Sequence, residues 1–170
     1  MRTLGVFASI VNGGRILLVR QAYGLRLWTT PGGAVEHAEL AIEALKREVR
    51  EEIGCEVNAW RFAGVYSKPY RNDIVLSFDV TVHSGTPRCA SQEISELGFF
   101  DQDNLPLDMA PNSRARILDA LERRAFVLRV FEDEFSHGVL SHSVRPNSSL
   151  NRTSWRSFGR AVKPPVNLFR

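Results

Sequence analysis

The stretch of sequence that decides the fold runs from Gly33 to Cys55 and reads GAVEHAELAIEALKREVREEIGC. It follows Pro31-Gly32, so it begins at a turn and continues into a run with helical spacing. At about 100° per residue, four aliphatic side chains fall on one stripe, namely Ile42, Leu45, Val49 and Ile53. Gly54 comes just past this stripe and is a residue type that ends helices. The stretch therefore predicts a glycine turn and an amphipathic helix that packs on a sheet.

Glutamates gather along one margin of the same helix. Glu48, Glu51 and Glu52 stand at positions i, i+3 and i+4, which are neighbours on a helix surface. Three carboxylates beside a core repel one another, and this repulsion raises their pKa values unless a cation relieves it. A solvated charged face is the plainer interpretation of such a helix. The preceding Pro-Gly-Gly turn, Glu39 and Gly54 favour a metal site instead.

The residue types indicate which metal such a site would hold. Carboxylate oxygens without a histidine or a suitable cysteine partner select Mg²⁺ or Mn²⁺ over Zn²⁺. The two cysteines, Cys55 and Cys89, are far apart in sequence and form no Cys-x-x-Cys pair. Mg²⁺ held by a few carboxylates keeps water molecules and accepts phosphate oxygens. We therefore expect a phosphorylated substrate, attacked by a metal-bound water held in line with phosphorus.

The same stretch carries a resemblance to a known family. It matches the Nudix box, G-x5-E-x7-R-E-U-x-E-E-x-G-U, in which U is an aliphatic residue. The positions in register are Gly33, Glu39, Arg47, Glu48, Val49, Glu51, Glu52 and Gly54, and Cys55 departs from the aliphatic residue at the end. The chain thus resembles the Nudix hydrolase superfamily over roughly residues 3–128.

This resemblance implies roles for particular residues. The ligands of Mg²⁺, for which Mn²⁺ can substitute, would be the side chains of Glu48, Glu51 and Glu52 and the carbonyl of Gly32. One of the three glutamates would orient or deprotonate the attacking water. Glu39 and Arg47 would form a pair that braces the turn against the helix.

A second element of the family resemblance lies further along the chain. EISELGFF, from Glu93 to Phe100, matches an E-I-x-E-x-x-F/W-F element in which a loop glutamate often completes the metal site. Glu93 is therefore the fourth candidate catalytic glutamate, and Glu96 is the second choice for the same role. The alternative is that both glutamates only keep a loop soluble.

Cations and aromatic residues in loops and at strand ends are candidates to hold the rest of a substrate. The substrate-binding candidates are Arg20, Arg26, Lys68 and Tyr70, and further candidates are Arg71, Tyr23, Trp28 and Tyr66. Guanidinium and ammonium groups hold phosphates, and aromatic rings stack on bases. A single such cation is more commonly a solvated surface charge. Trp28, just before the turn, is better explained as a core residue.

The pattern outside the box predicts an α/β fold. Residues 3–11 and 15–22 have the pattern of a hairpin closed by Asn12-Gly13-Gly14. Further strands are expected at 27–28, 34–35, 56–66, 74–82 and 97–100, and a second helix capped by Ser113 is expected to reach Ala125. Strands before and after a helix predict a mixed sheet between helices. The resemblance implies the Nudix-type α/β/α sandwich.

Charge is divided unevenly along the chain. The formal net charge is +3, yet every acid lies in residues 1–134, and residues 135–170 contain six basic residues and no acid. We expect residues 1–134 to form the Nudix hydrolase domain. Residues 135–170 are expected to be a basic, poorly ordered tail that is dispensable for chemistry. Because the domain itself is mildly acidic, the basic pI gives no argument for nucleic-acid binding.

The hydropathy of the chain gives an expectation for its location. No apolar run approaches the about 20 residues that cross a bilayer. Residues 4–11 could imitate a signal peptide, but they lead directly into the Asn-Gly-Gly turn and are better explained as the first strand. The sequence therefore predicts a cytoplasmic protein with no membrane partner.

The function that these patterns predict is Mg²⁺-dependent cleavage of a phosphoanhydride bond in a nucleoside diphosphate linked to another group. ADP-ribose, nucleotide sugars, dinucleoside polyphosphates and oxidised nucleoside triphosphates all fit the same box. The alternative is a non-catalytic Nudix domain that binds a nucleotide as a sensor or regulator. The box keeps all of its carboxylates, which favours the enzyme. The expected partner is a small nucleotide, and a homodimer is left open.

Overall fold

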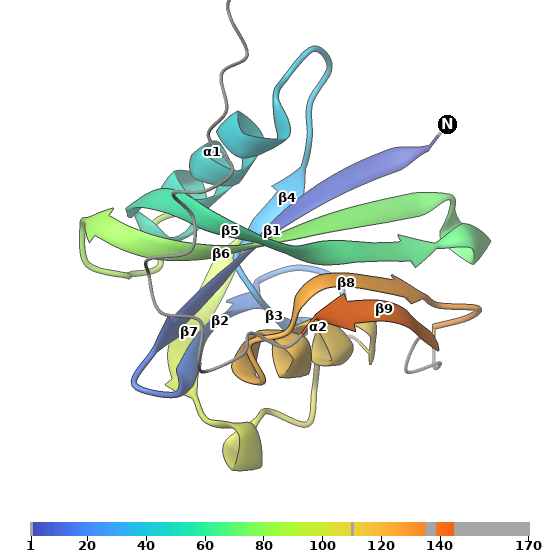
Figure 1. Cartoon of the computed structure of the whole chain (residues 1–170). Helices are drawn as coiled ribbons and strands as arrows, with labels where there is room; N and C mark the ends of the chain where they lie inside the picture. The colour runs from blue at the N-terminus through green and yellow to red at the C-terminus, as the bar shows by residue number, and fades with distance from the viewer. Residues whose placement is uncertain (1, 110, 135–138, 145–170) are drawn as a thin grey trace, which may run out of the picture.

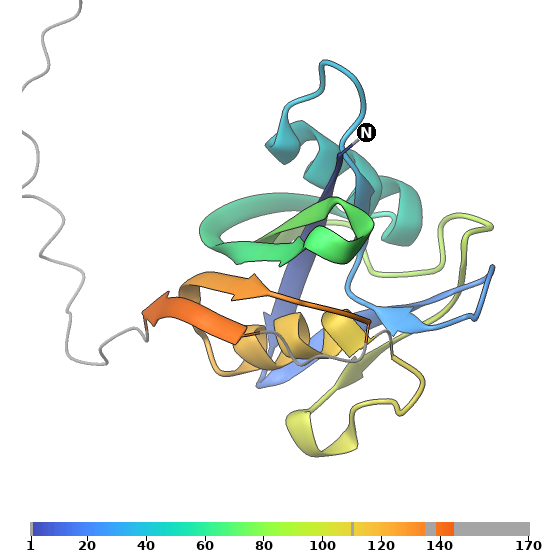
Figure 2. The same cartoon turned by 90° about the vertical axis from the view of Figure 1, so that its right-hand side faces the viewer.

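Two α-helices lie on opposite sides of a mixed β-sheet (Figures 1 and 2). The computed structural model describes residues 2–109, 111–134 and 139–144. Its α-helices are α1 (Ala41–Ile53) and α2 (Pro111–Leu121), and its short 3₁₀ helices are η1 (Pro69–Arg71) and η2 (Gln102–Asn104). Its strands are β1 (Thr3–Asn12), β2 (Arg15–Gln21), β3 (Trp28–Thr29), β4 (Gly32–Ala34), β5 (Glu56–Lys68), β6 (Asp73–Ser84), β7 (Ile94–Phe100), β8 (Ala125–Val130) and β9 (Val139–Val144). Over these residues, neither helix has the length and apolar character needed to span a membrane.

Strand β1 lies between β2 and β6, so it joins the part of the sheet that contains β2, β3 and β7 to the part that contains β5, β6, β8 and β9. The strand order is β3-β2-β1-β6-β5-β8-β9, with β4 paired to β1 and β7 paired to β2. β1 runs parallel to β6, and β5 runs parallel to β8, whereas β5 and β6 are antiparallel. The expected α/β/α sandwich with a mixed sheet is confirmed.

The hairpin at the start of the chain is confirmed by the register of its strands. Val11 pairs with Ile16 and Asn12 pairs with Arg15, so two residues form the turn. Gly13 and Gly14 both have positive φ, 57° and 78°. A two-residue turn of this kind needs positive φ at both positions, which glycine adopts without strain.

Helix α1 packs on the sheet through the stripe that the sequence predicts. Leu45, Val49 and Ile53 are fully buried against β1, in a core cluster that includes Val6 and Ala8 of that strand. Gly54 ends the helix in the left-handed conformation, with φ of 68°, and its N–H donates to the carbonyl of Arg50. The core therefore fixes α1 on one face of the sheet and directs its glutamate margin towards the edge of that core.

The second helix differs from the sequence prediction at both ends. α2 begins at Pro111, so Ser113 lies inside the helix and the prediction of a Ser113 cap is wrong. Proline suits the first helical turn because its missing N–H would have no helical partner there. Arg123, with φ of 55°, ends the helical stretch, and its N–H donates to the carbonyl of Ala120. Ala125 consequently opens strand β8 instead of extending the helix.

Strands β8 and β9 were not predicted from the sequence. β8 approaches β5 closely at Gly64, where a Cβ would lie 2.4 Å from the carbonyl oxygen of Val127. β9 pairs antiparallel with β8, with Val130 opposite Val139. β9 thus lies within residues 135–170, whereas residues 145–170 are outside the described part of the chain. The division of the chain at residue 134 stays a prediction.

Removing β9 is expected to lower the thermal stability of the protein. A chain that ends at Glu134 loses the β8–β9 backbone pairs and leaves β8 as an open sheet edge. We expect it to melt below a chain that ends at Val144, by about 2–4 °C for each kcal/mol lost. Calorimetry on the two truncated chains makes the comparison. Equal melting temperatures would show that β9 adds nothing to the stability of the fold.

Candidate active site

The turn before α1 lies directly against the first strand. β4 pairs with β1 so that Gly32 stands opposite Phe7 and Gly33 opposite Val6. Gly32 has φ of 142°, and a Cβ there would lie 2.1 Å from the carbonyl oxygen of Val6. A Cβ on Gly33 would lie 2.5 Å from the carboxyl carbon of Glu48. Gly32 requires glycine, because its φ is positive and its backbone touches β1, whereas a side chain at position 33 would displace the carboxylate of Glu48.

Glu52 is buried where this turn meets α1. The residue is 8% exposed, and its Oε2 accepts a hydrogen bond of 2.9 Å from the N–H of Gly32. The pKa of Glu52 is raised to about 8, first by burial and then by the charges of Glu48, Glu93 and Glu51, against the lowering effect of the Gly32 hydrogen bond. Glu52 therefore holds a proton at neutral pH until a cation supplies compensating charge.

Glu48 lies beside Glu52, half-buried against the turn. Burial raises the pKa of Glu48, Arg47 lowers it, and repulsion from Glu51 and Glu93 raises it again. The Nη1 of Arg47 donates to Glu48 Oε1 at 2.8 Å. One guanidinium therefore faces several carboxylates, which leaves the site with a surplus of negative charge.

Arg47 and Glu39 form a two-pronged ion pair across the turn. The Nε and Nη2 of Arg47 donate to the two carboxylate oxygens of Glu39, at 2.9 and 3.0 Å. Nη2 also donates to the carbonyl of Ala34, and the N–H of Glu36 donates to Glu39. Arg47 lowers the pKa of Glu39 to about 2, with help from the Glu36 hydrogen bond. The ion pair connects the loop to the helix, which is the contact expected of the brace that the family resemblance implies.

Four glutamates line one pocket of about 410 Å³. The pocket is formed by α1 and by a segment before β7, and its lining residues are Glu48, Glu51, Glu52, Ser91, Gln92 and Glu93. The structure therefore brings together all four glutamates that the sequence selects as catalytic. They come from two segments that are about 40 residues apart in the chain.

The end of α1 positions the segment that carries Glu93. The N–H of Ala90 donates to the carbonyl of Glu52, and the N–H of Arg88 donates to the carbonyl of Ile53. These carbonyls belong to the last turn of α1, which has no helical partners for them. The carbonyl of Glu93 in turn accepts from the N–H of Ala22. Backbone contacts thus hold Glu93 across the pocket from the helix.

The donor set fits a hard divalent cation that keeps part of its water shell. The pocket offers carboxylate oxygens, which Mg²⁺ and Mn²⁺ prefer. Across the described residues, no three histidine, cysteine or acidic side chains are close enough to enclose a metal ion by themselves. Mg²⁺ seldom takes an all-protein cage and leaves positions for water and phosphate. Because the pKa of buried Glu52 is raised to about 8, binding of such an ion would favour loss of its proton and make the carboxylate a ligand.

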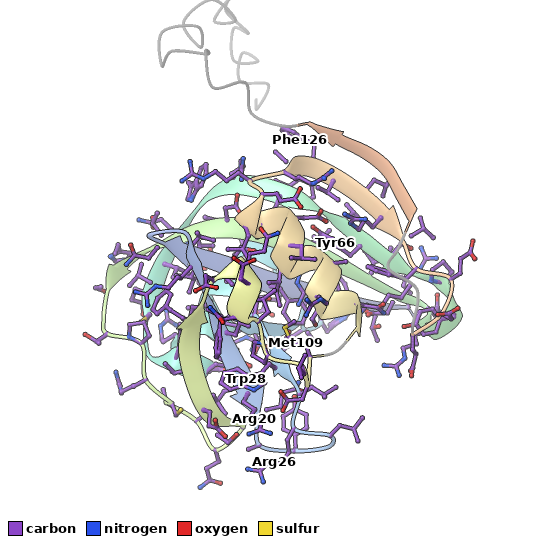
Figure 3. The ribbon with its side chains drawn as sticks, turned by 90° about the horizontal axis from the view of Figure 1, so that it is seen from below. Arg20, Arg26, Trp28, Tyr66, Met109 and Phe126 are labelled. Atoms are coloured by element: carbon purple, nitrogen blue, oxygen red, sulfur yellow. The ribbon has the colours of Figure 1, made fainter. Side chains whose placement is uncertain are left out.

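The predicted phosphate-binding cations lie outside the glutamate pocket. Arg20 donates to Glu96 at 2.8 Å and to Asp108 at 2.9 Å, so two carboxylates already occupy its guanidinium. Lys68 pairs with Asp73 at 2.8 Å. Arg26 lies beside Arg20 (Figure 3), and its carbonyl accepts from Arg20 Nε. Glu96, the second-choice candidate, consequently anchors Arg20 and does not line the glutamate pocket.

The aromatic candidates divide between the core and the site. Trp28 is buried, with its ring edge-on to Phe100, as the sequence predicts for a core residue. Tyr66 is also buried and donates to Asp119. Tyr23 is exposed, and its pKa is raised by partial burial and then by the charges of Glu93 and the other pocket glutamates. Among these three aromatic residues, Tyr23 is the one that lies within the electrostatic reach of the pocket.

A cluster of buried polar residues behind the glycine turn was not predicted from the sequence. Arg116 of α2 is 2% exposed, and its Nη2 donates to the hydroxyls of Thr29 and Thr30. Within the described residues its buried Nε has no acceptor, and no carboxylate forms an ion pair with it. Tyr70 is tied to the same helix, because its hydroxyl accepts from Asn112 at 2.7 Å. An arginine at position 116, one residue before the buried Ile117 in the apolar stripe of α2, was the available signal.

Comparisons with known proteins point to one family. Residues 1–121 match the NUDIX domain family. A Bacillus subtilis (strain 168) protein provisionally named an 8-oxo-dGTP diphosphatase is 32% identical over 70% of this chain and 80% of its own length. The NAD-capped RNA hydrolase NudC of Pseudomonas fluorescens (strain Pf0-1) is 31% identical over 64% of this chain, which spans 40% of that protein.

A solved structure supports the same grouping. The crystal structure of an ADP-ribose pyrophosphatase from Streptococcus suis 89-1591 superposes with a TM-score of 0.62. It is 25% identical in sequence and covers 72% of this chain and 92% of its own. The similarity thus extends from the box to the arrangement of the sheet and the helices.

Replacing Glu52 by glutamine should remove a pH-dependent cost of folding. Because the folded-state pKa of Glu52 is raised to about 8, the wild-type protein without divalent metal loses stability as pH rises from about 4.5 to about 8. Glu52→Gln keeps an oxygen for the Gly32 N–H and has no charge. We expect the variant to gain melting temperature relative to the wild type from pH 5 to pH 8.5, measured in EDTA. A difference that is the same at both pH values would contradict the buried charge.

Replacing Arg47 by lysine should weaken both the brace and the site. A lysine ammonium cannot reproduce the two-pronged contact with Glu39, so we expect a loss of about 1–3 kcal/mol in the free energy of unfolding. Arg50→Lys is the control, because Arg50 pairs with Glu56 on the exposed side of the same helix. Chemical denaturation measures both. Equal stability of the Arg47→Lys and Arg50→Lys variants would show that the pair with Glu39 braces nothing.

Proposed function

This chain belongs to the Nudix hydrolase family, and we propose that it is a Mg²⁺-dependent hydrolase of a nucleoside diphosphate linked to another group. The observation that carries this proposal is buried Glu52, held by the Gly32 N–H in a pocket with three more glutamates. Such a cluster is costly in an empty pocket and becomes favourable when a cation binds. The proposed reaction uses that cation on a substrate diphosphate.

Each glutamate has a proposed role that follows from its burial in the pocket. Glu48 and Glu52 are the most buried of the four and supply the inner metal ligands, together with the carbonyl of Gly32. When bound, the metal neutralises the diphosphate and lowers the pKa of a coordinated water. Glu51 and Glu93 are exposed to solvent, so they reach the outer side of the pocket. One of these two orients the water or accepts its proton.

The loop between β2 and β3 is the proposed contact with the rest of the substrate. Tyr23 and Arg26 are exposed in this loop, and no carboxylate of the described residues forms an ion pair with Arg26. A tyrosine ring stacks on a base, and a guanidinium binds phosphate oxygens. Arg20 and Lys68 contribute less, because their carboxylate partners already neutralise them.

The substrate class follows from a shared chemical feature. The relatives are named for 8-oxo-dGTP, NAD-capped RNA and ADP-ribose, each of which contains a phosphoanhydride next to a nucleoside. The glutamate pocket would act on that phosphoanhydride and would not distinguish the groups attached to it. We therefore propose a small nucleotide of this kind and expect side chains outside the pocket to select among its members.

Metal and Glu52 should both be required for turnover. We expect release of a phosphorylated product from at least one of five substrates with Mg²⁺: ADP-ribose, a nucleotide sugar, a dinucleoside polyphosphate, 8-oxo-dGTP and NAD-capped RNA. EDTA should abolish it, and Glu52→Gln should lower kcat/KM by about 100-fold or more. The control is Glu43→Gln, because Glu43 pairs with Lys46 on the exposed side of α1.

The same assay separates the enzyme from a nucleotide sensor. Binding of these nucleotides without any turnover in Mg²⁺ or Mn²⁺ would favour the non-catalytic alternative. Turnover that survives EDTA, or that Glu43→Gln lowers as much as Glu52→Gln does, would contradict the proposed metal site.

A further inference from the structure

A second cavity lies on the other face of the sheet from the glutamate pocket. Its volume is about 320 Å³, and β1, β5, β6 and the end of α2 form its walls. The lining residues include Ser9, Trp60, Arg61, Asp79, Thr81 and Arg123. The glutamate pocket is lined instead by α1 and residues 91–93, so the two sites share no residue. Figures 1 and 2 show α1 and α2 on opposite faces of the sheet.

Two polar side chains that line this cavity are buried. Ser9 lies on β1 and Asp79 lies on the neighbouring strand β6. Asp79 is 5% exposed, and its Oδ2 accepts from Arg61 Nε at 2.6 Å. Its Oδ1 is buried and has no hydrogen-bond partner among the described residues. A buried carboxylate oxygen without a donor is costly, so a donor group that reached it from the cavity would stabilise Asp79.

The rim of the cavity offers an aromatic surface and a second cation. Trp60 is 60% exposed although it is the largest type of apolar side chain, and the guanidinium of Arg61 lies 4.9 Å from its ring centre. Arg123 follows α2, and its carbonyl accepts from Arg61 Nη1. No acid of the described residues forms an ion pair with the side chain of Arg123. The rim therefore presents a flat ring beside a guanidinium that has no ion-pair partner among the described residues and acts on Asp79 only at longer range.

These features restrict the chemistry of a ligand. A simple cation would meet the positive charges of Arg61 and Arg123, and a simple anion would leave Asp79 Oδ1 without a donor. A ligand that satisfies both has a planar ring, an N–H donor and a negative group. The volume of about 320 Å³ is at the small end of the range for small-molecule sites.

We propose that this cavity binds a nucleoside monophosphate whose base carries an exocyclic amine. The base stacks on Trp60, its amine donates to Asp79 Oδ1, and its phosphate contacts Arg123. Carboxylates accept hydrogen bonds from base amines, and nucleic-acid bases stack on exposed aromatic side chains. The proposal is independent of the catalytic pocket, because none of these residues lines that pocket.

The test measures AMP binding to the full chain in EDTA. Nuclear magnetic resonance follows the indole N–H signal of Trp60, assigned by its loss in Trp60→Phe, and calorimetry gives the affinity. We expect AMP to shift this signal and Trp60→Ala to weaken binding about tenfold. Phe126→Ala is the matched control, because Phe126 is an aromatic residue with 59% exposure outside the cavity. Glu52→Gln should bind AMP as the wild type does.

Two analogues test the polar contacts. Purine riboside 5′-monophosphate lacks the amine and adenosine lacks the phosphate, so each should bind several-fold more weakly than AMP. An unmoved Trp60 signal, or equal affinities of Trp60→Ala and the wild type, would overturn the site. Loss of AMP binding in Glu52→Gln with none in Trp60→Ala would place AMP in the glutamate pocket and also overturn it. Equal binding of AMP and purine riboside 5′-monophosphate would overturn the contact with Asp79.

Discussion

The hydrogen bond from the Gly32 N–H to Glu52 is the contact on which the site depends. It joins the turn after β3 to the last turn of α1 and buries a carboxylate in the seam between them. The close contact of Gly32 with the backbone of β1 leaves no room for a side chain at that position, and a side chain on Gly33 would displace the carboxylate of Glu48. The apolar stripe of α1 holds the helix down on β1, and the glycines allow the turn to follow it. The positions of the carboxylates on α1 therefore follow from the packing of this helix on the core.

The seam between the turn and α1 contains more carboxylates than cations. Arg47 satisfies Glu39 fully and Glu48 in part, whereas Glu52 receives one backbone N–H and no cation. The result is a rigid loop and helix that carry uncompensated negative charge in a pocket open to solvent. A small divalent cation with its own water shell is the kind of ligand that such a surplus favours.

The sequence allowed prediction of what depends on neighbours along the chain. The Asn12-Gly13-Gly14 hairpin, the stripe of α1 and the four glutamates follow from local spacing and from the family motif. Contacts between distant segments were not predictable in the same way. Arg20 appears free in the sequence, yet Glu96 and Asp108 reach it only because β7 and the segment beside β3 flank β2. Strand β8 and buried Arg116 likewise depend on where α2 ends and what it covers.

A crystal structure with Mn²⁺, in which anomalous scattering locates the ion, shows directly whether the glutamate pocket binds a metal. We expect an ion within about 2.0–2.3 Å of carboxylate oxygens of both Glu48 and Glu52, with water in its remaining positions. In this arrangement the Gly32 N–H still reaches the other oxygen of Glu52. An ion bound elsewhere in the chain, or one that contacts neither Glu48 nor Glu52, would contradict it.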